Sequence, residues 1–339
     1  MKAMQYYGAR NVKVEEVAEP FVQQGTVKIK VKYAGICGTD LHEYHAQRIV
    51  PTVPMIMSHE FTGEIVEIGD GVTKFEVGDR VVVSPIISCM ECPSCRDGIF
   101  NTCDNLKAYG IHYNGGFAEY AVIPEANVIP IPDSLSYELA AIVEPASVAM
   151  QAVHTSTLKI GDKVAVFGAG PIGLLITQCA KAAGASQIFV VEIEEARQKL
   201  AFEMGADIVI NPLEEDAAQK ILELTDGGVN IAYEAAGVEA TFNAALDSIR
   251  HNGEVMIVSV FTKPVTYNPV IQEKGQKKIH TSRGYFKIFP RVIALLQKGS
   301  LQVEPIITSK IALDDIVELG FEKLDARKDE CKILVSPEV

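Results

Sequence analysis

Four cysteines occur close together in the sequence, at Cys89, Cys92, Cys95 and Cys103. The two-residue gaps allow one loop to present three thiolates to a metal ion, and the fourth can return from Cys103 to complete a tetrahedron of sulfur ligands. In a chain that is expected to be cytosolic, this spacing favours metal binding over disulfide bonds. It therefore predicts a zinc site, with an iron–sulfur cluster as the main alternative.

A second set of reactive side chains lies earlier in the chain. The segment from Tyr33 to His42 is rich in turn-forming residues and carries Cys37, Thr39 and His42 within six residues. Thiolate and imidazole groups bind zinc, and an imidazole can also transfer protons near neutral pH. Taken alone, Cys37 fits a protein interior better than a metal site, because a free cysteine behaves as a small apolar residue.

A glycine pattern predicts a dinucleotide site. The apolar run 163–167 ends in Gly168-x-Gly170-x-x-Gly173, with Pro171 and Ile172 before the last glycine, and leads directly into a helix-like segment. In such a unit the first glycine permits a tight turn, the second lets the backbone approach a pyrophosphate, and the third packs the helix on the strand. By itself the pattern is weak evidence, because glycine-rich turns are common in large enzymes.

An acidic residue strengthens this prediction. The apolar run 187–191 ends at Glu192, nineteen residues after Gly173. A carboxylate there can accept hydrogen bonds from the adenosine ribose hydroxyls of NAD, and it would repel the additional phosphate of NADP. The sequence therefore predicts NAD as the cofactor.

The elements that must position these residues differ along the chain. Residues 1–35 alternate apolar and polar positions, which predicts strands with one face in water, and 43–57 read as a loop. After about residue 160, apolar runs alternate with helical patterns, which predicts a parallel sheet with helices on both faces. We expect strands at 164–167, 187–191, 207–210, 230–233 and 254–260, and helices at 171–183, 194–204, 214–225 and 238–249. The last apolar run, Glu254 to Phe261, is expected at the edge of this sheet.

Composition excludes several classes of function. The chain has 339 residues, of which 48% are hydrophobic, and this suggests about two domains with substantial cores. Its net charge of −13 disfavours a nucleic-acid partner, because phosphate binding needs a basic surface. The first residues carry no apolar signal core and no run is long enough to span a bilayer, so we expect a cytoplasmic protein that does not bind a membrane.

A family resemblance rests on the residues around His59. The pattern His59-Glu60-x-x-Gly63-(x)5-Gly69-x-x-Val72, followed by Phe75-x-Val77-Gly78-Asp79-Arg80, resembles the signature of zinc-containing medium-chain alcohol dehydrogenases. The resemblance covers essentially the whole chain. It implies an α/β protein in which a GroES-like, mostly-β catalytic domain (1–149 and 286–339, with a zinc lobe at 86–105) is interrupted by an inserted Rossmann NAD-binding domain (150–285). The family has its active-site zinc in the cleft between the two domains.

The resemblance also assigns roles to residues. It implies two zinc ions per chain, a structural one on the four cysteines of the 86–105 lobe and a catalytic one on Cys37 and His59. Ethanol-type enzymes have a third cysteine ligand where this chain has Glu144, and the polyol branch is similar in using glutamates there. Glu60 and Glu144 would then share the ligand and water-holding roles. Thr39 and His42 resemble the proton relay of the family.

Further cofactor contacts are implied at Arg197, Val258 and Ser282. Two departures from the family pattern concern loops: Ser58 stands where a glycine usually precedes the His-Glu pair, and Thr281-Ser282-Arg283 replaces the usual Gly-Ser near the nicotinamide. Both put local loop geometry in question and leave the class unchanged.

These observations predict a zinc- and NAD-dependent oxidoreductase acting on a small secondary alcohol or a vicinal diol of the 2,3-butanediol type. Alternatives are an L-threonine 3-dehydrogenase or a sorbitol or sugar-polyol dehydrogenase. A non-catalytic protein that binds zinc and a dinucleotide is an alternative from another class. Because sheet edges of this kind pair readily, a homodimer or homotetramer is expected.

Overall fold

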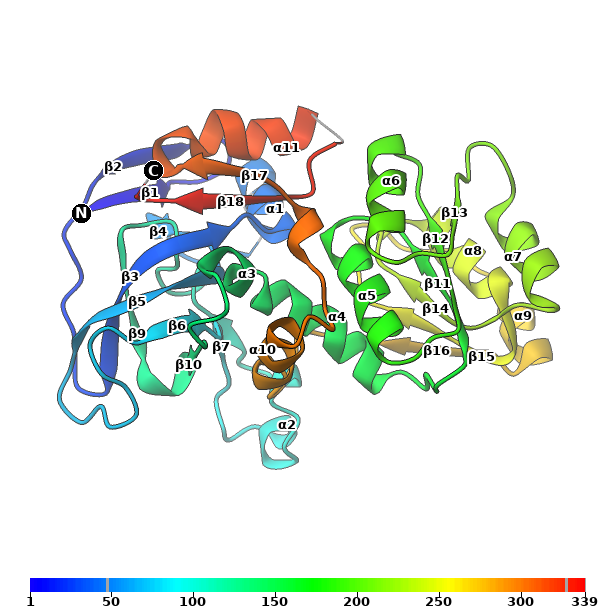
Figure 1. Cartoon of the computed structure of the whole chain (residues 1–339), viewed down its shortest axis with the longest axis horizontal. Coiled ribbons are helices and arrows are strands. Elements are labelled where there is room, and N and C mark those ends of the chain that lie inside the picture. The colour runs from blue at the N-terminus through cyan, green and yellow to red at the C-terminus, as the bar shows by residue number, and fades with distance from the viewer. Residues whose placement is uncertain (47–48, 327–328, 339) are drawn as a thin grey trace. The chain divides into compact units, whose positions relative to one another are not determined.

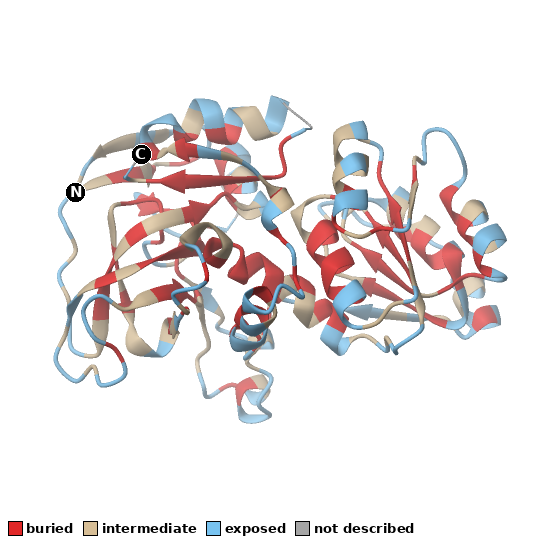
Figure 2. Cartoon of the chain, viewed as in Figure 1, coloured by how far each residue is buried: buried red, intermediate tan, exposed pale blue. Residues whose placement is uncertain are grey.

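The computed structural model describes residues 1–46, 49–326 and 329–338. The chain divides into two compact units. The first comprises Met1–Glu144, Phe289–Gln297 and Ile307–Val339, and the second comprises Pro145–Ile288 and Lys298–Ile306 (Figure 1). Figure 2 shows that buried residues are concentrated on the strands and on the inner faces of the helices within each unit.

The first unit is built mainly of antiparallel strands. Its largest sheet contains β3 (Thr26–Gly35), β5 (Glu60–Ile68), β6 (Arg80–Val83), β9 (Tyr120–Pro124), β10 (Val128–Pro130), β17 (Ile307–Ala312) and β18 (Lys332–Ser336). The order is β10-β6-β5-β3-β18-β17, with β9 also paired to β3. A smaller sheet joins β1 (Lys2–Tyr6) to β2 (Val12–Glu16) and β4 (Met55–Ile56), and β7 (Ile86–Ile87) pairs with β8 (Lys107–Ala108).

The expected strands in residues 1–35 are confirmed as β1, β2 and β3. The polar face of β3 is less exposed to solvent than the alternation suggested. Val27, Ile29 and Val31 are fully buried in the core. Lys28 is also buried, because its ammonium group pairs with Glu19 at 2.9 Å and with Glu67 at 2.5 Å. The lysine can be buried because two carboxylates pair with its charge.

The segment after Cys37 differs from the sequence prediction. The segment expected to be turns and loop forms helix α1 (Gly38–Ala46). Asp40 fixes its start: the Cys37 N–H donates to Asp40 Oδ2 at 2.9 Å, and the Asp40 N–H donates to the Cys37 carbonyl at 3.0 Å. Asp40, Glu43 and Tyr44 lie on one face and are buried, so tertiary packing outweighs the turn-forming character of the residues.

The remaining helical segments of the first unit are short. They are α2 (Pro93–Arg96), η1 (Phe100–Thr102), η2 (Glu125–Asn127), α3 (Tyr137–Ala141), α10 (Phe289–Gln297), η4 (Leu313–Asp315), η5 (Ile316–Phe321) and α11 (Glu322–Ala326). Helix α4 (Val143–Thr155) leads into the second unit, which also contains η3 (Glu304–Ile306). The sequence suggested a mostly-β domain up to residue 149, but its last residues are helical, in α3 and the start of α4.

The second unit contains a parallel sheet of six strands. They are β11 (Lys163–Phe167), β12 (Gln187–Val191), β13 (Ile208–Ile210), β14 (Val229–Glu234), β15 (Ile249–Ile257) and β16 (Lys278–Thr281). The order is β13-β12-β11-β14-β15-β16, and every pairing is parallel. The direction of winding reverses between β11 and β14, which is where such sheets bind ligands at the carboxyl ends of their strands.

Five helices connect these strands: α5 (Pro171–Ala182), α6 (Glu195–Glu203), α7 (Ala217–Thr225), α8 (Glu239–Ser248) and α9 (Pro269–Gly275). Figure 1 shows α5 and α6 on one face of the sheet and α7, α8 and α9 on the other. The predicted alternation is confirmed, but α7 starts three residues later than the predicted 214. The Asp216 side chain accepts a hydrogen bond from the Gln219 N–H at 3.0 Å and so caps the helix at Ala217.

The predicted sheet edge was wrong. The strand that contains Glu254 is β15, which ends at Ile257 and pairs with β14 on one side and β16 on the other. The edge is β16, a short strand of mixed polarity that the sequence reading missed. Among the described residues, no helix combines the length and apolar character needed to cross a membrane.

Candidate active site

The structure brings together three of the predicted metal ligands. Cys37, His59 and Glu60 offer a sulfur, a ring nitrogen and a carboxylate oxygen that all lie within 4.8 Å of one another. Cys37 precedes α1, His59 lies immediately before β5, and Glu60 is the first residue of that strand. The pairing of β3 with β5 sets Gly35 opposite Glu60, so the chain that leaves β3 delivers Cys37 to the same place.

A glycine is required at this point. A Cβ atom on Gly35 would lie 2.2 Å from Glu60 Oε2, which no real contact allows. Any side chain at position 35 would therefore displace the Glu60 carboxylate. The sequence analysis missed this residue, and only the register between the two strands reveals it.

Lys332 is a second residue that the sequence analysis missed. Its ammonium nitrogen reaches Glu60 Oε2 at 2.6 Å, Glu60 Oε1 at 2.9 Å and the Ile36 carbonyl at 3.0 Å. Both charged side chains are almost fully buried. The ion pair therefore fixes the orientation of the Glu60 carboxylate beside Cys37 and His59.

His59 is buried and electrostatically coupled to its neighbours. Burial alone would lower the pKa of His59, but its acidic neighbours, Cys37 foremost, together outweigh that effect and raise the pKa well above its ordinary value. The charges of Asp40 and Glu144 act in the same direction. Within the described residues, His59 Nδ1 is buried without a hydrogen-bond partner. A ring nitrogen beside a thiol and a carboxylate can serve as a metal ligand, and a bound cation would take the place of the proton on the ring.

Asp40 and Glu144 lie close to this cluster. Burial raises the pKa of Asp40 to about 6, and its carboxylate accepts the Cys37 N–H. Glu144 stands in the first turn of α4 and is 6% exposed. It does not belong to the described group of three ligand atoms within 4.8 Å, although its charge reaches His59.

Ser58 shows why its family position favours glycine. Its φ angle is +73°, a left-handed conformation that side chains other than glycine adopt at a cost. The side chain offsets part of this cost, since its hydroxyl donates to the Gly35 carbonyl at 3.2 Å and accepts from the Glu60 N–H at 3.4 Å. The loop therefore keeps a conformation that a glycine would adopt freely. The serine hydroxyl also links Gly35 to Glu60.

Thr39 and His42 lie on α1, three residues apart and therefore on one face of the helix. His42 is exposed and Thr39 is half-buried. A hydroxyl group that is half-buried and an imidazole that meets solvent are suitable for passing a proton outward.

The four-cysteine lobe forms a separate cluster. The sulfur atoms of Cys89, Cys92, Cys95 and Cys103 all lie within 4.8 Å of one another, and Phe100 and Leu106 pack against them. The Cys89 N–H donates to Cys103 Sγ at 3.2 Å, and the Cys92 N–H donates to Cys89 Sγ at 3.3 Å. Backbone amides, above all that of Glu91, lower the pKa of Cys89 to about 6. Burial raises the pKa of Cys95 to about 12, so without a metal ion the amides favour thiolate charge at Cys89 and not at Cys95.

The glycine pattern forms the turn between β11 and α5. Gly168 has a φ angle of +97°, and a Cβ atom on Gly173 would lie 1.9 Å from the Gly168 carbonyl oxygen. A Cβ atom on Gly170 would meet nothing within 4 Å, so there is open space at the N-terminus of α5. Pro171 begins the helix and Ile172 follows it. The turn therefore fits a phosphate group.

Glu192 follows β12 and is buried against this turn. Its carboxylate accepts hydrogen bonds from the N–H groups of Ala169 at 2.6 Å, Ile193 at 2.9 Å and Glu194 at 3.0 Å. The carboxylate is thus fixed at the carboxyl end of the sheet, beside the glycine turn.

The other predicted cofactor residues lie at the same edge or near it. Arg197 is on α6, Val258 directly follows β15, and Ser282 directly follows β16. The Ser282 N–H donates to the Ile257 carbonyl at 2.9 Å. The Ser282 hydroxyl is buried and has no hydrogen-bond partner in the described part of the chain.

Comparison with known families identifies the chain. Residues 23–133 match the family model of the alcohol dehydrogenase GroES-like domain, and residues 171–298 match that of the zinc-binding dehydrogenases. The chain belongs to the zinc-binding dehydrogenase family. It is therefore an oxidoreductase that acts on CH–OH groups with a nicotinamide cofactor, in a GroES-like domain combined with a Rossmann domain.

Individual members of this family match over nearly their whole length. The chain is 43% identical to (R,R)-butanediol dehydrogenase from Bacillus subtilis, over 99% of this chain and 100% of the relative. It is 40% identical to L-threonine 3-dehydrogenase from Pyrococcus horikoshii, over 97% and 95%. The crystal structure of 2R,3R-butanediol dehydrogenase from Bacillus subtilis superimposes with a TM-score of 0.94 at 41% identity, covering 99% of both chains.

A solved structure with a cofactor is also similar. A zinc-binding dehydrogenase from Sinorhizobium meliloti, bound to NADP, superimposes with a TM-score of 0.95 at 32% identity, again over 99% of both chains. Members of this family therefore bind a nicotinamide dinucleotide in the same fold. Which of the two dinucleotides this chain uses depends on its own residues.

Proposed function

We propose that this zinc-binding dehydrogenase oxidises a small vicinal diol of the 2,3-butanediol type, with NAD as hydride acceptor. The observation that carries the proposal is the group of Cys37, His59 and Glu60 beside Glu144, in a chain 43% identical to a butanediol dehydrogenase over its full length. A glutamate at 144 replaces the third cysteine ligand of ethanol-type enzymes, which favours a polyol substrate.

The donor atoms of this group fit a zinc ion. A thiolate, an imidazole and a carboxylate are ordinary zinc ligands, and a catalytic site keeps one position open. Cys37 and His59 would hold the ion, with Glu60 and Glu144 sharing the remaining protein position. A zinc ion held there would act as a Lewis acid on the substrate oxygen, and the nicotinamide would take the hydride. The four-cysteine lobe would hold a second, structural zinc.

The protein groups around these ligands orient them and move the proton. Lys332 fixes the Glu60 carboxylate, and Asp40 fixes the backbone of Cys37. Thr39 would accept the proton of the substrate hydroxyl and pass it toward His42 at the surface. A positioned imidazole of this kind typically contributes about 10²-fold or more to the rate.

Glu192 supports NAD over NADP. Its carboxylate is held by the amides of Ala169, Ile193 and Glu194 and cannot swing away from a 2′-phosphate without breaking these bonds. Arg197 would contact the adenosine, and Val258 and Ser282 would contact the other end of the cofactor.

In Glu192→Ser, the ratio of kcat/KM for NAD over that for NADP should fall. Glu203→Ser, an exposed acid on the same helix as Arg197, should leave the ratio unchanged. A wild-type enzyme that used NADP as well as NAD would contradict the assignment.

The substrate can be tested directly. Initial rates of NADH formation would be compared for the 2,3-butanediol stereoisomers, sorbitol, L-threonine and 2-butanol at equal concentrations. The proposal expects kcat/KM to be highest for one butanediol isomer. Highest efficiency with L-threonine would favour the second candidate, which the 40% identity to a threonine dehydrogenase supports.

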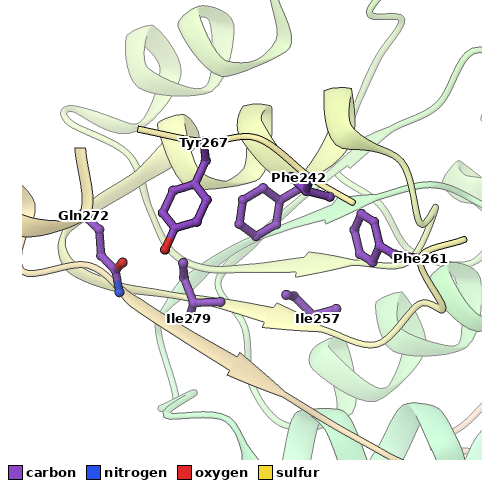
Figure 3. Close-up of a pocket in the computed structure, with 7 residues that line it drawn as sticks. Phe242, Ile257, Phe261, Tyr267, Gln272 and Ile279 are labelled. Carbon is purple, nitrogen blue, oxygen red and sulfur yellow. The ribbon is translucent and has the colours of Figure 1, made fainter. Parts of the chain in front are cut away.

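We further propose a homodimer or homotetramer, joined at β16 in place of the strand first expected at the edge. Lys278, His280 and Thr281 of β16 are exposed. An apolar pocket of about 360 Å³ lies beside this strand, and Figure 3 shows the rings of Phe242, Phe261 and Tyr267 facing Ile257 and Ile279. Light scattering at micromolar concentration should give at least twice the mass of one chain, and a monomer would refute the proposal.

A cytoplasmic location agrees with the cysteine chemistry. None of the seven cysteines forms a disulfide, as expected in a reducing compartment. Fractionation of cells that express the protein would test this.

A further inference from the structure

Glu234 is a buried carboxylate that none of the proposed steps uses. It ends β14 and is fully buried. Its Oε1 accepts hydrogen bonds from the Ala236 N–H at 3.0 Å, the Gly237 N–H at 2.9 Å and the Thr241 hydroxyl at 2.7 Å. Its Oε2 accepts the hydroxyl of Ser259. In the described structure no lysine or arginine pairs with it, so neutral donors alone hold the charge.

These bonds connect two loops. Ala236, Gly237 and Thr241 belong to the segment after β14, whereas Ser259 belongs to the segment after β15. The backbone repeats the connection, because the Glu234 carbonyl accepts the N–H of Val258 at 2.9 Å and that of Ser259 at 3.2 Å. The backbone at 234 thus holds Val258, a proposed cofactor contact, and the Glu234 carboxylate holds the next residue, Ser259.

The loop after β14 also packs against the glycine turn. The Ala235 N–H donates to the Phe167 carbonyl at 2.9 Å. A Cβ atom on Gly168 would lie 3.0 Å from the Ala236 Cβ, so the two loops are in tight contact. On its other side, a Cβ atom on Gly237 would lie 2.8 Å from the Val260 carbonyl. One carboxylate thus lies where three loops meet, after β11, β14 and β15.

We propose that Glu234 is a positioning residue for the dinucleotide. By holding the loop after β14, it keeps the glycine turn, which would bind the pyrophosphate, in register with Val258, which would contact the other end of the cofactor. The carboxyl ends of adjacent parallel strands are where such sheets bind their ligands, and the three loops occupy that edge. The inference rests on the proposed function, since it requires that the Rossmann unit binds NAD.

The test is a pair of substitutions at position 234. Glu234→Ala removes both carboxylate oxygens, so Ala236, Gly237, Thr241 and Ser259 lose their common acceptor, while the backbone bonds from Val258 and Ser259 to the residue 234 carbonyl remain. The Kd for NADH, measured by fluorescence titration, should rise, and kcat should fall. The ratio of kcat to this Kd should decrease by about tenfold or more. Glu234→Gln keeps an oxygen for the two backbone amides and Thr241, and its amide nitrogen can donate to the Ser259 hydroxyl. It should restore the NADH affinity and kcat to near the wild-type values.

Glu254 provides a matched control. It is equally buried in the same sheet, on β15, and accepts hydrogen bonds from the Thr157 N–H at 2.9 Å and the Thr157 hydroxyl at 2.5 Å. It lies three positions before Ile257, where the ladder between β15 and β16 begins, and so away from the carboxyl ends of the strands. Glu254→Ala should lower the melting temperature as Glu234→Ala does, but leave the Kd for NADH unchanged.

The outcomes separate the possible explanations. A Glu234→Ala protein that loses thermal stability but keeps its NADH affinity and kcat would overturn the proposal. If Glu234→Ala does not fold, the double variant Thr241→Val/Ser259→Ala decides, because it removes two donors and leaves the carboxylate in place. That variant should weaken NADH binding, and unchanged binding would count against Glu234. A wild-type protein that binds no NADH would refute the proposed function itself.

Discussion

Lys332 and Glu60 form a buried ion pair in which the ammonium nitrogen lies 2.6 Å from one carboxylate oxygen and 2.9 Å from the other. The side chains are 2% and 1% exposed. Coulombic attraction to Glu60 opposes the effect of burial, and the pKa of Lys332 is raised above its ordinary value. The Lys332 ammonium group therefore stays charged, and from β18 it fixes the carboxylate of a proposed metal ligand.

Lys332→Met should destabilise the protein strongly, because it leaves the Glu60 charge buried without its partner. The expected loss in the free energy of unfolding is about 3–5 kcal/mol, measured by urea denaturation. Lys332→Met/Glu60→Gln should recover much of this loss, since neither charge remains, while activity stays low.

The control for this prediction is Lys2→Met. Lys2 pairs with Asp314 at the surface of the same unit, with side chains 38% and 60% exposed, so its loss should change the free energy of unfolding far less than the loss of Lys332. Equal losses for the two single variants would contradict the role given to the buried pair.

The four-cysteine lobe predicts the metal content. Active wild-type protein should contain two zinc ions per chain by elemental analysis. Cys95→Ser should retain one and melt at a lower temperature, because Cys95 is buried in the lobe and structural zinc contributes to folding. Cys179→Ser, a buried cysteine in α5, should retain both. Two zinc ions in Cys95→Ser would refute the assignment of the lobe.

Local spacing explains which parts of the site could be predicted from the sequence. The glycine turn and the cysteine lobe each lie within one short segment, so the distances between their residues follow from the chain itself. Glu192 was predictable because it ends the strand after the glycine helix. Cys37 and His59 were assigned only through the family resemblance, since nothing local connects a residue just before α1 with one just before β5.

Contacts between distant segments could not be predicted. Lys332 lies 272 residues from Glu60, and no pattern around it marks a buried lysine. Helix α1 was read as turns because Gly38, Thr39 and Asp40 favour turns, whereas burial of Tyr44 stabilises the helix. Strand β16 escaped notice because Lys278–Thr281 is too short to show a period.

Glu330 predicts a pH dependence of stability. Burial would raise the pKa of Glu330, but Lys323 and the hydroxyls of Thr308 and Ser309 outweigh this and lower it. A lowered pKa means that the stabilisation is present above the pKa of the unfolded chain and disappears as pH falls through the folded-state pKa. Glu330→Gln should therefore unfold more easily than wild type at pH 7, and the two melting temperatures should converge below about pH 4.

Glu195→Gln serves as the comparison for Glu330. Its pair with Lys199 on α6 is exposed, with side-chain exposures of 81% and 70%, so its melting temperature should follow that of wild type at both pH values. A gap between Glu330→Gln and wild type that widened toward low pH would show that the sign is wrong.

His42 should affect turnover without affecting the metal sites. It is exposed on α1, one turn after Thr39, and we propose that it carries the substrate proton to solvent. His42→Ala should keep both zinc ions and bind NADH normally, but kcat should fall by about tenfold to a hundredfold near neutral pH. Added imidazole, or a higher pH, should restore part of the rate because solvent species then accept the proton.

His45→Ala is the matched control, since it removes an imidazole from the same helix. His45 is already engaged, with Nε2 at 2.7 Å from the Asp325 carboxylate, so it is not available to carry a proton from the site. Its loss should leave kcat and the imidazole response unchanged, although stability can decrease slightly. If His42→Ala turned over like wild type with its metal content intact, His42 would be an ordinary surface residue, and the proton would have to leave from Thr39 directly to solvent.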